Sequence, residues 1–94
     1  MLFSLYCLDY PDGYPLRMAN YDAHRTYLAN SPVKVVMSGP LESDDGEKRI
    51  GSLLIIEAEN LDQATAFSNA DPFRMNGVFE SVEIRRFVKA IDNR

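Results

Sequence analysis

The chain has 94 residues, which is enough for one domain near the lower limit of self-sufficient size. Its formal net charge of −4, with basic residues scattered along the chain, disfavours nucleic acid or an anionic membrane as a partner, because both need a concentrated basic surface. A single cysteine, Cys7, cannot form an internal disulfide, and no apolar run approaches the ~20 residues of a membrane span, so we expect one cytoplasmic domain with a frayed tail at residues 89–94.

The N-terminal segment predicts a strand that is covered on both sides. Across residues 2–8, Phe3, Leu5 and Cys7 share one face, and the opposite face is also mostly apolar. The turn formers in residues 9–13 predict a loop after this strand.

A helix is predicted over residues 15–29, because Pro15 suits a first helical turn and the sequence Asn30-Ser31-Pro32 ends one. Ala19 and Ala23 predict a small-residue stripe for close packing. An adjacent stripe on the same helix contains Arg17, Tyr21, His24 and Leu28.

Two strands are predicted next. Residues 33–37 are apolar and rich in β-branched side chains, and Gly39-Pro40 predicts a turn at the end of that strand. An acidic loop over residues 42–47 leads into a strand at residues 50–58, which is apolar on both faces.

A second helix is predicted from Leu61 to about Ala70. Asn60 and Gln63 have the spacing of a capping box, which marks its start. Its predicted buried stripe contains Leu61, Ala64 and Phe67.

A sharp corner and a last strand follow this helix. Pro72 disfavours helical backbone angles at Asp71, so we expect Asp71 to be extended just past the helix end. The last strand is predicted over residues 78–88, with Phe79 on the face opposite Val82.

The resulting order, β-α-β-β-α-β, predicts an α+β sandwich of the ferredoxin-like type, with two helices on one face of a four-stranded antiparallel sheet. The other face then exposes an apolar patch that is large for a soluble monomer. We expect a second copy to cover it in a homodimer or a higher oligomer; a moderately apolar face that is tolerated in solvent is the simpler alternative.

The single histidine and the acidic corner are the candidate catalytic groups. If Asp71 accepts a hydrogen bond from one imidazole nitrogen of His24, it fixes the tautomer and raises the basicity of the other nitrogen. Such a pair suits general acid–base catalysis near neutral pH. Each residue also has a structural role open to it, His24 at the edge of the core and Asp71 as a turn cap before Pro72.

Other reactive residues give weaker signals. Cys7 has no basic neighbour in sequence and is better explained as buried packing. Ser38 and Ser52 are candidates for lining a cleft, and Arg17 for holding a substrate anion, with surface solvation as its more ordinary role. One histidine and no cysteine cluster disfavour a zinc site, and neither a phosphate loop nor a serine-hydrolase motif is present.

Several different short motifs are spread along nearly the whole chain. They are Arg17 and His24 on the first helix, Ser38-Gly39-Pro40-Leu41, Gly51-Ser52, Asp71-Pro72-Phe73, Gly77-Val78-Phe79 and Val82-Glu83-Ile84. In this combination the chain resembles the YciI-like (YCII-related) family of the dimeric α/β-barrel superfamily. The most specific part is the Asp-Pro-aromatic segment followed by Gly-Val-aromatic, paired with an upstream histidine.

The resemblance implies a ferredoxin-like fold that dimerises through its sheet into a barrel, with His24 and Asp71 paired in a cleft beside the first helix. The best-defined relatives remove HCl from chlorinated hydroxyquinones, and structural cousins isomerise muconolactones. Many members carry an arginine three residues before the histidine, where this chain has Tyr21, a residue suited to stacking on an aromatic ring.

We therefore expect a lyase or isomerase that needs no cofactor and acts on a small hydroxylated aromatic compound or lactone. The catalytic pair would be His24 and Asp71. The expected substrate-binding residues are Arg17, Ser38 and Ser52 as polar groups and Tyr21 and Phe73 as apolar walls. Two alternatives stay open: a dimeric module that binds a small molecule without turning it over, and a haem enzyme with His24 as axial ligand.

Overall fold

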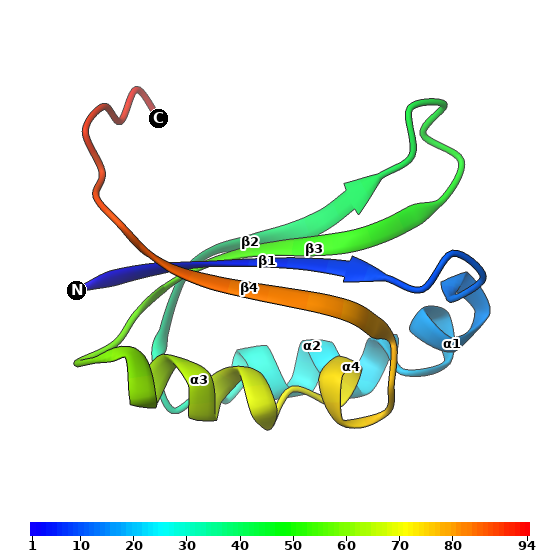
Figure 1. Ribbon diagram of the computed structural model, residues 1–94, viewed down its shortest axis with the longest axis horizontal. Coiled ribbons are helices and arrows are strands. Elements are labelled where there is room, and N and C mark those ends of the chain that lie inside the picture. The colour runs from blue at the N-terminus through cyan, green and yellow to red at the C-terminus, as the bar shows by residue number, and fades with distance from the viewer.

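The computed structural model, which describes residues 1–94, places a sheet against a layer of helices (Figure 1). The strands are β1 (Leu2–Asp9), β2 (Lys34–Glu42), β3 (Arg49–Glu57) and β4 (Phe79–Phe87), paired antiparallel in the order β2-β3-β1-β4. The helices are α1 (Tyr14–Ala19), α2 (Tyr21–Ala29), α3 (Leu61–Asn69) and α4 (Pro72–Met75). They lie on one side of the sheet, as the ferredoxin-like prediction requires. No helix combines the length and the apolar sequence needed to span a bilayer.

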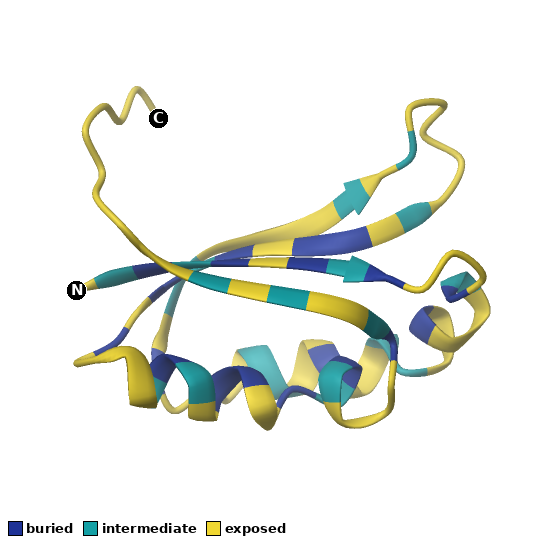
Figure 2. Cartoon of the chain, viewed as in Figure 1, coloured by how far each residue is buried: buried dark blue, intermediate teal, exposed yellow.

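The core lies between the two layers, because one face of each central strand is apolar (Figure 2). Its buried residues are Phe3, Leu5, Cys7, Val33, Leu54, Ile56, Ala58, Ala64 and Phe67. Burial, with the nearby charge of Asp71, raises the pKa of the Cys7 thiol to about 12. Cys7 therefore packs as an apolar side chain, as predicted, and is not a thiolate nucleophile.

The first predicted helix is two helices, α1 and α2, with Asn20 at their junction. Asn20 departs from helical backbone angles, at φ −107° and ψ 6°, and both its backbone N–H and its side-chain amide donate hydrogen bonds to the carbonyl oxygen of Leu16. The prediction of a packed stripe at Ala19 and Ala23 is wrong, since both are exposed.

The predicted cap of α3 by Asn60 is confirmed, but the return bond from Gln63 goes to Glu59, the residue before the cap, and not to Asn60 as in a capping box. The Asn60 side chain accepts a hydrogen bond from the Gln63 backbone N–H at 2.8 Å, and the Gln63 side chain accepts one from the Glu59 N–H at 2.7 Å. Ala64 and Phe67 are buried as predicted. Leu61, in the first turn, is 53% exposed, so its predicted burial is wrong.

Three shifts in strand register decide which side chains face the helices. They fall between Val35 and Met37, between Leu41 and Glu42, and between Leu8 and Asp9. At each, one strand carries an extra residue, and a β-bulge of this kind turns the side chains beyond it to the other face of the sheet.

The extra residue in β2, Val36, corrects the prediction of a turn at Gly39-Pro40. After it, Ser38 pairs with Leu54 and Pro40 pairs with Ser52, so both face the helices. β2 runs on to Glu42 as an edge strand, where proline is tolerated because its missing N–H breaks no ladder hydrogen bond.

The extra residue in β4, Glu80, corrects the predicted orientation of Phe79. Phe79 pairs with Asp9 and packs against the core, on the same side of the sheet as Val82. The simple alternation of a regular strand places it on the opposite side.

Gly51 leaves no room for a side chain in the middle of the sheet. A Cβ atom at this position would lie 2.2 Å from the carbonyl oxygen of Cys7 on β1. We expect Gly51→Ala to lower the free energy of unfolding by about 2 kcal/mol in urea denaturation. Gly39→Ala is the matched control, because a Cβ there meets nothing within 4 Å. Equal stability of the two variants would contradict this packing.

Candidate active site

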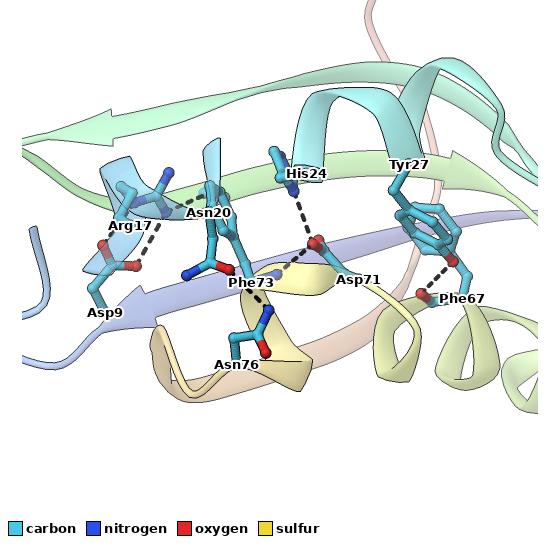
Figure 3. A network of polar contacts seen from close by, with 10 residues as sticks. Asp9, Arg17, Asn20, His24, Tyr27, Phe67, Asp71, Phe73 and Asn76 are labelled. Atoms are coloured by element: carbon cyan, nitrogen blue, oxygen red, sulfur yellow. Dashed lines mark hydrogen bonds and ion pairs between the residues drawn. The ribbon is translucent and has the colours of Figure 1, made fainter. Parts of the chain in front are cut away.

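His24 and Asp71 meet although they are 47 positions apart. The imidazole Nδ1 of His24, on α2, lies 2.8 Å from the carboxylate Oδ1 of Asp71, the residue before α4 (Figure 3). The two residues are only 7% and 3% exposed, so solvent competes little for this hydrogen bond.

Asp71 both caps the turn before Pro72 and contacts His24, the two interactions that its sequence position suggests. Its backbone is extended, at φ −66° and ψ 126°, as predicted from the following proline, and its Oδ1 accepts a hydrogen bond from the Phe73 backbone N–H at 2.9 Å. The same oxygen pairs with His24. An ionised carboxylate only accepts hydrogen bonds, so with Asp71 ionised this contact requires a proton on Nδ1 of His24, and in the neutral imidazole Nε2 is then the proton acceptor.

The ring of Phe73 supports the site from within the core. It stacks on the imidazole of His24, with the ring centroids 3.9 Å apart and the planes 9° from parallel. The guanidinium carbon of Arg17 lies 4.5 Å from the centroid of the same ring. Phe73 is fully buried and does not border the cleft described below, so it positions His24 and Arg17 rather than forming a wall.

Arg17 is held in a second buried network. Its Nε lies 2.7 Å from Oδ2 of Asp9, and its Nη2 donates to Oδ1 of Asp9 at 3.1 Å and to the Ser52 hydroxyl at 2.8 Å. Arg17 is 2% exposed, so the surface role considered for it is wrong.

Asp9 is one of the residues beside the cleft that the sequence does not predict. The sequence predicts a loop at this position, whereas β1 extends to include Asp9 and buries it at 8% exposure. The signal was present, because Asp9 continues the every-second-residue pattern of Phe3, Leu5 and Cys7.

A cleft of about 280 Å³ opens beside these two networks, between the helices α1 and α2 and the strands β2 and β3. Its lining residues are Arg17, Tyr21, His24, Arg25, Leu28, Ser38, Gly39, Pro40, Ser52 and Leu54. Five of the seven predicted site residues thus share one cleft, while Asp71 and Phe73 lie behind it. The sequence reasoning did not select Arg25.

The free nitrogen of His24 is open to this cleft. Nε2 makes no hydrogen bond within the chain. Every fully buried side-chain nitrogen or oxygen in the protein does have a hydrogen-bond partner, so Nε2 is not fully buried. Nε2 must therefore reach solvent on the cleft side. No group of three His, Cys, Asp or Glu side chains is placed to hold a metal ion.

Comparison with known families and proteins identifies the family of the chain. The family model described as "YCII-related domain" covers residues 1–88. The chain belongs to the YCII-related family. The protein YciI of Escherichia coli O6:H1 is 31% identical to this YCII-related chain, over 95% of the chain and 98% of YciI, and YciI of Shigella flexneri matches equally.

A solved structure extends the similarity to three dimensions. The 5-chloro-2-hydroxyhydroquinone dehydrochlorinase TftG from Burkholderia phenoliruptrix AC1100, in complex with 2,5-dihydroxybenzoquinone, superposes with a TM-score of 0.85. It is 35% identical to this YCII-related chain, and the match covers 94% of both chains. The likeness confirms the ferredoxin-like α+β fold.

Loss of the Asp9 charge should destabilise the folded chain. Asp9→Asn leaves the buried guanidinium of Arg17 without its counter-charge, and we expect the free energy of unfolding to fall by about 3 kcal/mol. Asp12→Asn, at an exposed position in the following turn, makes the same charge change and should stay within ~0.5 kcal/mol of the unaltered protein. Urea denaturation measures both, and similar values for the two variants would argue against the ion pair.

Proposed function

We propose that this YCII-related chain is a lyase or isomerase that needs no cofactor and acts on a small hydroxylated aromatic compound or lactone. The observation that carries the proposal is the state of His24, whose Nδ1 is held by Asp71 while its Nε2 opens into the cleft. The likeness to TftG supports it, because that protein is a dehydrochlorinase whose complex holds a hydroxyquinone.

The position of His24 suits both removal of a proton from a substrate and its return. In an elimination, Nε2 of His24 takes a proton from the substrate, and the electron pair released forms the new double bond as the leaving group departs with its own pair. Asp71 stabilises the imidazolium that forms. In an isomerisation, the imidazolium returns the proton to another carbon of the same conjugated system.

Arg17 is placed to stabilise negative charge on a substrate oxygen. Its Nε and Nη2 are used by Asp9 and Ser52, but Nη1 donates to neither and Arg17 borders the cleft. A guanidinium that is already oriented by a buried carboxylate stabilises a developing oxyanion without reorganising during the reaction. Ser38 offers a further hydroxyl on the opposite wall, from β2.

Removal of either member of the pair should abolish most of the turnover. We expect His24→Gln and Asp71→Asn each to lower kcat by about 10²- to 10⁴-fold, because general acid–base catalysis contributes on that order. The assay follows chloride release from chlorinated hydroxyhydroquinones, and solvent deuterium incorporation into lactones by NMR. Asp62→Asn, exposed in the first turn of α3, is the control with the same charge change and should keep full activity.

Undiminished turnover in both His24→Gln and Asp71→Asn would exclude the proposed role of the pair. Saturable binding of 2,5-dihydroxybenzoquinone with no product from any compound of the panel would instead favour the alternative, a module that binds a small molecule without converting it.

We also propose that two copies pack through the sheet face that carries no helix. By strand register that face carries Tyr6, Met37, Leu53 and Phe87, each between 40% and 47% exposed. Each of the four strands thus contributes one exposed large apolar side chain to this face, and such a surface is typical of an interface rather than of a solvated face. A two-fold axis would pair the same face of both copies.

A charge in the centre of this face should separate the copies. We expect the unaltered protein to show twice the mass of one chain in size-exclusion chromatography with light scattering, and Leu53→Lys to show the mass of one. Leu61→Lys is the matched control, since Leu61 is also an exposed leucine, at 53%, but lies in the helical layer. A monomeric unaltered protein would end the dimer proposal.

A further inference from the structure

Tyr21 stands at the outer part of the cleft between two guanidinium groups. The guanidinium carbon of Arg25 lies 5.6 Å from the centroid of its ring, and that of Arg49 lies 5.4 Å from it. Arg25 is exposed and Tyr21 and Arg49 are half-buried, whereas Arg17 and His24 are buried deeper in the same region. The cleft therefore has an inner end at His24 and an outer end at Tyr21.

Arg49 reaches this position because of a β-bulge. Leu41 pairs with Gly51 but the next residue of β2, Glu42, pairs with Arg49, so Ile50 is the extra residue. In a regular strand Arg49 would share the face of Gly51 and Leu53, away from the helices. The bulge turns it toward α2, where it contacts Tyr21.

Neither of these two cations forms an ion pair within the protein. No carboxylate forms an ion pair with Arg25 or Arg49, although Asp22 is beside Tyr21 in sequence and Glu42 is the cross-strand partner of Arg49. The residues that line the cleft include two arginines and a histidine but no acidic residue. In a chain with a net charge of −4, this end of the molecule attracts anions.

We propose that Tyr21, Arg25 and Arg49 form an outer subsite that binds a carboxylate, so that the substrate is a small aromatic ring bearing an ionised carboxyl group. A carboxylate matches the planar fork of a guanidinium, and the Tyr21 ring offers a face on which the substrate ring can stack. The subsite deepens the proposed function, since a ring anchored there extends inward to Nε2 of His24. The cleft volume of about 280 Å³ suits a single ring of this type.

The test compares two ligands that differ at one group, which is an ionised carboxylate in the first and its neutral methyl ester in the second. Isothermal titration calorimetry with 2,5-dihydroxybenzoate and with its neutral methyl ester measures the preference for a carboxylate. We expect the unaltered protein to prefer the carboxylate, and Arg25→Gln and Arg49→Gln each to reduce that preference about three- to fivefold. The double variant should lose it on the order of tenfold, with ester binding unchanged. Arg86→Gln, an exposed arginine on β4, is the charge-matched control.

Two outcomes would overturn the subsite. The first is that the unaltered protein binds the two ligands equally well or binds neither. The second is that the double variant prefers the carboxylate as strongly as the Arg86→Gln control does. The preference should also weaken as ionic strength rises, because the arginines are partly exposed. His24→Gln separates the two proposals. This variant should lose turnover and keep the preference for the carboxylate. If the unaltered protein shows the preference but no turnover, the subsite stands and only the enzymatic role is lost.

Discussion

One carboxylate oxygen joins the fold to the candidate chemistry. Oδ1 of Asp71 accepts a hydrogen bond from the Phe73 backbone N–H, which starts α4, and pairs with Nδ1 of His24 on α2. The first contact holds the carboxylate in place, and the second orients the imidazole so that its other nitrogen meets the cleft. Capping of α4 and pairing with His24 are therefore compatible, because one carboxylate oxygen makes both contacts.

The buried ion pair between Arg17 and Asp9 fixes a second charged group, the Arg17 guanidinium, near the pair of His24 and Asp71. Burying the Arg17–Asp9 pair costs solvation free energy that its attraction offsets only in good geometry, so stability alone is a weak reason for it. The ring of Phe73 lies against both Arg17 and His24. This single side chain lies between Arg17, the proposed oxyanion-stabilising cation, and His24, the proposed base, and both are held on packed elements.

Irregular strand pairing shapes the rest of the cleft. Extra residues at Val36, Ile50 and Glu80 each reverse the facing of the strand beyond them. The first brings Ser38 to the cleft, the second brings Arg49 to Tyr21, and the third brings Phe79 to the edge of Phe73. Bulges are frequent beside active sites because they aim side chains that regular alternation would turn away.

By itself, the sequence determined what depends on neighbouring residues: the extended backbone of Asp71 before Pro72, the cap at Asn60, and the order of the four strands with helical segments after the first and third. It did not predict the division of the first helix or the short helix α4. It predicted His24 and Asp71 as partners, but it did not predict that the same Asp71 oxygen contacts the imidazole and caps α4. Only the tertiary structure decided the burial of Arg17 against Asp9 and the facing of Phe79. The reason is physical, since the position of a bulge depends on the pairing of two strands, and a pattern within one strand does not contain its partner's register.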